Sequence, residues 1–225
     1  MLEPRPAQVG LVRSGALTFA GVAGAAATVY VLQVAMGRML PVTDYSLYAA
    51  LSGIFNMVAV PLSAVLLVVT RAAALAAGRG DSGEVAAVRH QAVRELTIGG
   101  AAALVLGIAA SGLLAGALGS SSPWPVVVMW IAVAANVALA LGLALLQGAH
   151  RFMPLTVANF ASAIVRLVSS LALVSMGFGV AGTMAGAALA CGLGSIAVWV
   201  ALGPSPASEA RRHQQTLSQE VVARA

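Results

Sequence analysis

Long apolar stretches separated by short polar segments dominate the pattern of this chain. Six stretches are long enough to form membrane-crossing helices, at residues 15–36, 46–70, 96–119, 126–146, 155–176 and 180–202. An α-helix rises about 1.5 Å per residue, so about 20 residues cross a hydrocarbon core of about 30 Å. The pattern therefore predicts an all-α, polytopic membrane protein whose six transmembrane helices form one bundle.

The polar segments divide the chain into three parts. Residues 1–14 form a polar N-terminal segment, residues 15–202 the bundle, and residues 203–225 a polar tail or linker. The longest connection is 71–95. It begins as a good helix former, is broken by glycines at 78–83, and continues as a sequence suited to a short interfacial helix. We expect that helix to lead into the third span.

Composition supports a membrane protein and excludes a soluble domain. Hydrophobic residues make up 60% of the chain and charged residues 8%. A soluble domain of this size needs far more charge to cover its surface. The single cysteine, Cys191, lies inside the sixth stretch, where we expect it to be a small packing residue.

The arginines predict the orientation. The chain has 12 Lys and Arg residues in total, and all of them are Arg. With six crossings, ten arginines fall on the side of both termini, Arg38 alone falls on the other side, and Arg166 lies inside the fifth stretch. The positive-inside rule then places both termini in the cytoplasm and the chain in the cytoplasmic membrane. The first stretch is longer than the apolar core of a signal peptide, so we expect it to be retained.

The net charge of +5 therefore reflects topology. No basic stripe interleaved with aromatic residues is present, so we expect no nucleic-acid partner. Small residues recur at four-residue intervals and predict close helix packing. They lie in the third span (Gly107, Ser111, Ala115, Gly119, with Gly112 and Gly116 on a neighbouring face) and in the sixth (Gly182, Gly186, Ala190, Gly194).

Residues suited to catalysis or metal binding are scarce. The three histidines lie in polar segments beside arginines, without ligand spacing, at His90, His150 and His213. The glycines at 177, 179 and 182 match a dinucleotide-binding pattern, but no strand or βαβ unit accompanies them. All seven carboxylates lie outside the apolar cores. The sequence predicts no enzyme activity, no cofactor and no metal.

Arg166 is the one charge in the middle of an apolar stretch. A central arginine costs about 2.5–3.5 kcal/mol on insertion scales, so such a residue usually faces a bundle interior or an aqueous cavity. Asn159, Ser162 and Ser169 lie at helical spacing on the same side and complete a polar stripe. A guanidinium in a cavity suits a phosphate or pyrophosphate group. The alternative is an arginine that bonds carbonyls between helices.

Further polar positions interrupt the other spans. Gln33 lies in the first, Asn56 in the second and Asn136 in the fourth. For these amides, hydrogen bonds between helices compete with ligand contacts. Pro61 removes a backbone N–H from the second span, so we expect it to kink that helix.

Several segments resemble the polysaccharide biosynthesis exporters, which are lipid-linked oligosaccharide flippases of the multidrug/oligosaccharidyl-lipid/polysaccharide (MATE-like) superfamily. They are VLQVAMGRMLPVTDYSLYAAL, VPLSAVLLVVTRAAALAAGRGD and LLQGAHRFMPLTVANFASAIVRLVSSLALVSMGFGVAGTMAGAALA. Arg38, in the first outer turn before Asp44-Tyr45, and Arg71, at the end of the second span, are similar to the family pattern. Pro41 and Ser46 depart from it where the family often has glycine.

The resemblance covers residues 14 to 202 and implies one bundle of a MATE-like transporter. Such transporters usually have two bundles, so a second six-helix bundle is the implied partner, from a second copy or a separate chain. The implied function is translocation of a lipid-linked sugar or polysaccharide precursor, with membrane lipids around it. Arg166, Asn159, Ser162 and Ser169 would bind the anionic head group, with Arg38, Arg71, Asn56 and Gln33 as secondary contacts.

Other functions stay open on the same sequence. A multidrug or small-molecule exporter of this superfamily would be favoured by an intramembrane carboxylate, which the sequence lacks. A non-transporting scaffold of a polysaccharide assembly complex would need its glycine-rich faces and not Arg166. A membrane enzyme is disfavoured by the lack of any carboxylate, histidine or cysteine cluster.

Overall fold

The computed structural model describes residues 6–80 and 82–203, and side chains from residue 19 onward except that of Ser82. This part of the chain is helical, without strands. Its elements are α1 (Pro6–Met39), α2 (Val42–Arg79), α3 (Ser82–Ala109), α4 (Ser111–Ala117), α5 (Trp124–Gly148), α6 (Phe152–Leu173), the π-helical turn η1 (Val174–Phe178) and α7 (Gly179–Leu202).

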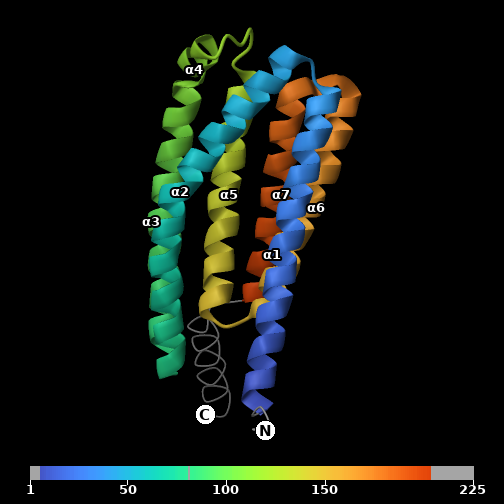
Figure 1. The fold of residues 1–225 in the computed structure, drawn as a ribbon. Helices are drawn as coiled ribbons and strands as arrows, with labels where there is room; N and C mark the ends of the chain where they lie inside the picture. Colours follow the sequence, from blue (N-terminus) through green and yellow to red (C-terminus); the bar gives the residue numbers. More distant parts are fainter. Residues whose placement is uncertain (1–5, 81, 204–225) are drawn as a thin grey trace, which may run out of the picture.

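The long helices run roughly along one axis (Figure 1). One end, here called the terminal end, holds the start of α1, the α2–α3 turn, the α5–α6 connection and the end of α7. The distal end holds the α1–α2 turn, α4 and η1. Five arginines lie towards the terminal end. Arg71 and Arg79 are in the last part of α2, Arg89 and Arg94 are in the first half of α3, and Arg151 directly precedes α6.

Length and composition make these helices compatible with a multi-pass membrane protein. The described residues contain five candidate spans, at Phe19–Met39, Val42–Arg79, Gly83–Ala109, Trp124–Gly148 and Phe152–Leu202. The last of these includes α6, η1 and α7, and the chain reverses within it. The helical candidates thus number five or six, according to whether this hairpin is taken as one span or two.

The reversal between α6 and α7 depends on two glycines. Gly177 has φ +90° and ψ 8°, and Gly179 has φ +53° and ψ −136°. An L side chain is strained at positive φ, and the second conformation is nearly confined to glycine. Gly177 and Gly179 therefore belong to a turn between helices.

Two sequence predictions about helix boundaries were wrong. In the 71–95 connection the predicted helix and its break within 78–83 are confirmed, because α2 continues to Arg79 and a left-handed Gly80 ends it. The separate interfacial helix is absent, because α3 runs unbroken from Ser82 to Ala109. The third predicted span, 96–119, is interrupted at Ala110, where α3 gives way to the short α4. Alanine has the highest helix propensity, so a helix in alanine-rich sequence can continue beyond the apolar stretch that predicts it.

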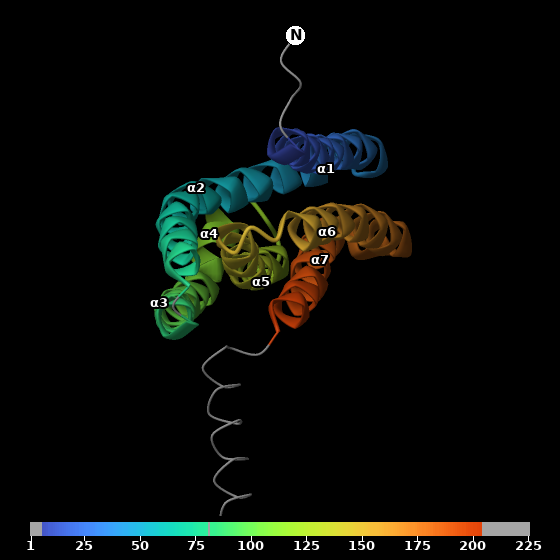
Figure 2. The ribbon, with the colours of Figure 1, turned by 90° about the horizontal axis from the view of Figure 1, so that it is seen from below.

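The bundle has a clear centre and periphery. In the most apolar window of each helix, 44% of α5 is buried but none of α2. Viewed along the axis, α5 lies in the middle, α1 and α2 lie along one side, and α3 and α7 occupy the opposite side (Figure 2). The exposed apolar side chains of the outer helices are compatible with contact with a lipid bilayer.

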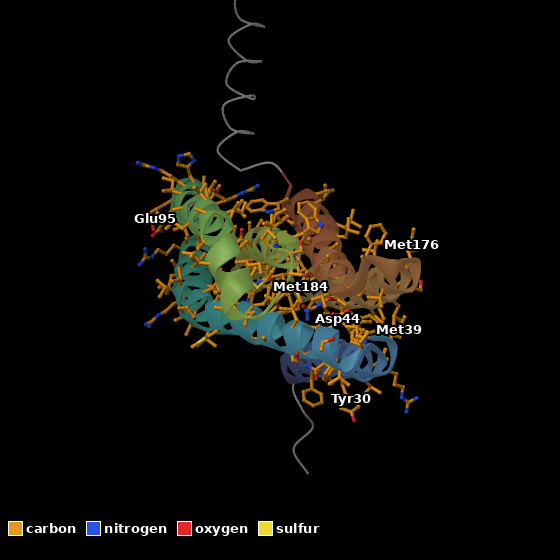
Figure 3. All side chains as sticks on the ribbon, turned by 90° about the horizontal axis from the view of Figure 1, so that it is seen from above. Tyr30, Met39, Asp44, Glu95, Met176 and Met184 are labelled. Carbon is orange, nitrogen blue, oxygen red and sulfur yellow. The ribbon has the colours of Figure 1, made fainter. Side chains whose placement is uncertain are left out.

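The core is densest towards the distal end. There Leu32 and Met36 of α1 meet Leu51 of α2, Met129 of α5 and Met184 of α7, each at most 2% exposed. Seen from the distal end, the side chain of Met184 lies near the middle of the bundle, whereas Tyr30 and Met176 lie at the edge (Figure 3). This cluster packs α1 and α2 against α5 and α7.

Small residues set the closest helix contacts. A Cβ on Gly186 would lie 2.7 Å from the backbone nitrogen of Ser170, and one on Gly194 would overlap the Ser162 hydroxyl. In the same way, Gly24 of α1 faces the ring of Phe160 on α6. The small-residue pattern of 182–194 therefore packs α7 against α6, as predicted.

The pattern of the third span is used only in part. Gly107 lies against the indole of Trp130 on α5, and Ser111 and Ala115 are buried. A Cβ at Gly112 or Gly116 would meet nothing within 4 Å. The G-x-x-x-G pair therefore makes no close helix contact within the described chain.

The end of α7 is fixed by two arginines. Arg151 Nη1 donates a hydrogen bond to the carbonyl of Ala201 at 2.7 Å, and Arg89 Nη1 donates to that of Gly203 at 3.0 Å. Carbonyls at a helix C-terminus have no partner within the helix and carry partial negative charge, so cations are favourable there. These contacts join α3, α6 and α7 at the terminal end.

Candidate functional site

Arg166 lies close to the midpoint of the helical run formed by α6 and η1, at half the depth of the bundle. Its side chain is half-buried, and its guanidinium carbon lies 5.7 Å from the ring centroid of Phe55 on α2. This is a cation–π contact. The Nε atom is buried and has no hydrogen-bond partner within the described chain. The guanidinium is thus held by a ring face and lacks a full set of acceptors.

A thiol on α7 and an amide on α5 form a second polar feature of the bundle. Cys191 of α7 is buried. Cys191 Sγ lies 3.8 Å from the Oδ1 of Asn136 on α5. Asn136 and Cys191 therefore form a polar contact between α5 and α7.

No carboxylate neutralises Arg166 among residues 6–80 and 82–203. The carboxylates there are Asp44, Glu84 and Glu95. Asp44 lies in the first turn of α2, and Phe55 is eleven residues further on, about 16 Å along the helix. Glu84 pairs with Arg79 at the terminal end, and Glu95 accepts a hydrogen bond from Gln91. The positive charge within the bundle therefore has no ion-pair partner in this part of the chain.

Two members of the predicted stripe have a packing role. Ser162 is buried, donates to the Ala158 carbonyl at 2.8 Å, and faces Gly194 of α7. Ser169 donates to the Val165 carbonyl at 2.6 Å and lies 3.2 Å from the Gly186 carbonyl. Hydroxyls committed to backbone carbonyls at a helix interface are poor ligands for a head group. The α6–α7 contact accounts for both serines.

The polar stripe of α6 is covered by helices of the same bundle and does not face lipid. Ser162 and Ser169 lie between α6 and α7, and Arg166 is half-buried among helices of the same chain. Helix spacing places residues 159, 162, 166 and 169 on one side of α6, and the structure shows that this side is already covered by α7 and its neighbours. The stripe therefore needs no second bundle to shield it.

The other predicted contacts do not gather around Arg166. Asn159 is half-buried two turns away on α6, while Gln33 on α1 and Asn56 on α2 are exposed. Arg38 and Arg71 are also exposed, near the distal end of α1 and towards the terminal end of α2. Within the described part of the chain, no hydrogen bond joins any of these five residues to the Arg166 guanidinium.

Pro61 lies inside α2, which is assigned as one continuous helix. The ribbon of α2 runs obliquely over its first half and then turns to lie beside α3 (Figure 1). Pro61 is near the middle of that helix, and a missing backbone N–H is the usual cause of such a bend. The bend brings the second half of α2 against α5, where Thr70 Oγ1 lies 3.3 Å from the Ala144 carbonyl.

Sequence reasoning missed Phe55. An aromatic residue in an apolar stretch carries no signal that it will face a cation on a helix more than 100 residues away in sequence. The described residues contain no group of three or more His, Cys, Asp or Glu side chains suited to a metal ion. What the arrangement offers chemically is a positive charge at mid-depth with donor capacity for an anion.

Comparison with family models, with curated proteins and with solved structures found no significant match.

Proposed function

We propose that this chain is one bundle of a membrane transporter that moves a lipid-linked oligosaccharide or polysaccharide precursor across the cytoplasmic membrane. The observation that carries the proposal is the guanidinium of Arg166, held within the bundle by Phe55 without a carboxylate partner in the described chain. Lipid-linked sugars carry phosphate or pyrophosphate next to the lipid, and such a group would supply the missing negative charge.

The orientation and the second bundle belong to the same proposal. The arginine-rich terminal end faces the cytoplasm by the positive-inside rule. In transporters built from two bundles, the substrate site lies between them near the middle of the membrane. The exposed apolar faces of α1 and α2, of which α2 has no buried residue in its most apolar window, fit contact with such a second bundle. The resemblance of the sequence to the polysaccharide biosynthesis exporters supports a lipid-linked sugar as the substrate.

A flipping assay tests the proposal. The purified chain is reconstituted in vesicles with a lipid-linked sugar, and the sugar that reaches the other leaflet is measured by its accessibility to an impermeant reagent. Arg166→Ala should abolish flipping. Arg166→Lys should restore only part of it, because an ammonium cannot make the bidentate contact of a guanidinium. Arg79→Ala, which removes an exposed arginine, is the matched control and should retain flipping.

The outcomes separate transport from a scaffold role. Loss of flipping in Arg166→Ala with normal insertion and unfolding behaviour supports the anion site. Full flipping in that variant refutes the role of Arg166. Normal polysaccharide assembly in cells that carry only Arg166→Ala refutes the anion site and favours a scaffold role.

A further inference from the structure

An apolar groove is lined by residues of α3, α5 and α7. These helices lie side by side, with α3 and α7 flanking α5 (Figure 2). The volume of the groove is about 450 Å³, within the range of small-molecule sites. The walls are α3 from Val93 to Leu104 and the facing side of α5 from Ala134 to Leu141, and Trp199 of α7 also lines the groove. Small side chains at positions 100, 101, 134 and 138 make it hollow.

The length of the groove corresponds to one leaflet. Eleven residues separate Val93 from Leu104 on α3, which is about 16 Å along a helix. Half of a hydrocarbon core is about 15 Å. The groove therefore extends from near the terminal end of the bundle to about the middle of the membrane. An acyl chain of a lipid in that leaflet has this direction and extent.

Positive side chains stand at the terminal end of the groove. Arg89 is one helical turn before Val93, its guanidinium carbon lies 5.4 Å from the Trp199 ring, and it is half-buried. Its hydrogen bond to the Gly203 carbonyl takes one of five donors. His90 and Arg94 are spaced so that they lie on one side of α3 with Thr97, which lines the groove. Both are closer to the terminal end than Thr97, and both are exposed.

Negative charge is turned away from this position. Glu95 lines a separate small pocket between α2 and α3 and accepts the hydrogen bond of Gln91. It points outward from α3 in the end-on view (Figure 3). Arg94 is in no ion pair or hydrogen bond with the described part of the chain. The groove thus has an apolar length and a cationic mouth with a tryptophan, as interfacial lipid sites do.

We propose that this groove binds one anionic phospholipid of the leaflet at the terminal end. The acyl chain lies along α3 and α5, and the phosphate contacts Arg89 and Arg94 beside Trp199. The two arginines together make the site prefer an anionic over a zwitterionic lipid by roughly thirtyfold. The site is distinct from Arg166 and does not depend on the transport proposal.

Fluorescence of Trp199 tests the site directly. The Trp124→Phe/Trp130→Phe variant leaves Trp199 as the only tryptophan of the chain. It is placed in zwitterionic nanodiscs containing a small, equal mole fraction of either phosphatidylglycerol or phosphatidylcholine with brominated acyl chains, which quench a tryptophan on contact. The brominated phosphatidylglycerol should quench Trp199 several-fold more strongly.

Five variants in this background separate the site from general attraction to the membrane. Arg89→Gln/Arg94→Gln should remove the preference, and Arg94→Gln alone, at an exposed position, should reduce it. Gly100→Leu should block the groove, because Gly100 lines it, whereas Gly99→Leu is its control, since nothing lies within 4 Å of that position. Arg71→Gln, an exposed arginine towards the same end, should keep the preference.

The contrary results are equally clear. Equal quenching by both brominated lipids in the unaltered background shows ordinary contact with surrounding lipid and overturns the site. Quenching by neither lipid shows that protein covers the groove, from the chain's own tail or a second copy, and also overturns it. A preference that survives Arg89→Gln/Arg94→Gln rejects the two arginines as the phosphate contacts.

Discussion

The guanidinium carbon of Arg166 lies 5.7 Å from the ring centroid of Phe55, and these two residues join α6 to α2 at mid-depth. A cation–π contact contributes about 0.5–2 kcal/mol, whereas a central arginine costs about 2.5–3.5 kcal/mol on insertion scales. The ring therefore offsets only part of the cost. A residue retained at a net cost in stability is a candidate for function.

Replacing this charge should stabilise the protein. In Arg166→Met an unbranched apolar side chain takes the place of the guanidinium, so the free energy of unfolding should rise by about 1 kcal/mol. Val168→Met, at a 60% exposed apolar position of the same helix, should change it little. Denaturant titration of the purified protein in micelles measures both. A loss of several kcal/mol in Arg166→Met would show that the arginine holds the bundle together.

The α6–α7 interface should be sensitive to a single methyl group. In Gly186→Ala the new Cβ would lie 2.7 Å from Ser170 N and 2.8 Å from its Cα, so the helices must separate. We expect a loss of about 1–3 kcal/mol. Gly192→Ala, on the same helix with nothing within 4 Å, should gain up to about 1 kcal/mol from helix propensity. If the two variants unfold alike, the close contact at Ser170 is absent.

The turn at η1 should distinguish backbone strain from packing. Gly177 has φ +90° with nothing near its Cβ position, so Gly177→Ala should cost about 1–2 kcal/mol through conformation alone. Gly177→Asn should cost less, because asparagine tolerates the left-handed region better. The comparison is made by the same denaturant titration. A neutral alanine variant would place this glycine in an ordinary helical conformation.

Sidedness can be measured at the two ends of the bundle. In a Cys191→Ala background, Gly83→Cys at the start of α3 lies at the terminal end, and Ser121→Cys follows α4 at the distal end; both positions are exposed. An impermeant thiol reagent applied to intact cells should label position 121 and leave position 83 unlabelled until the membrane is opened. The reverse pattern would invert the proposed orientation. The predicted topology also places Gln214 in the cytoplasm, but this residue lies outside the described residues.

Much of the helical layout could be predicted because it depends on local sequence. The apolar stretches of about 20 residues and the glycines at 177 and 179 act through the local backbone. The small residues of α7 act through its contact with α6, the helix that precedes it in the chain. The exact helix ends could not be read in this way. The unbroken course of α3 from Ser82 and the interruption at Ala110 depend on which alanine-rich segments find packing partners, and hydropathy does not encode that.

By itself, the sequence determined that the chain is made of long apolar helices with arginines towards one end, and that Arg166 stands within an apolar helix. These properties follow from composition and the 1.5 Å rise of a helix. Only the tertiary structure decided what Arg166 meets. Helix spacing grouped it with Ser162 and Ser169, but packing assigned those hydroxyls to the α6–α7 interface and turned the guanidinium towards Phe55. The reason is physical: spacing fixes which side of a helix a residue occupies, and the neighbouring helices fix what covers it.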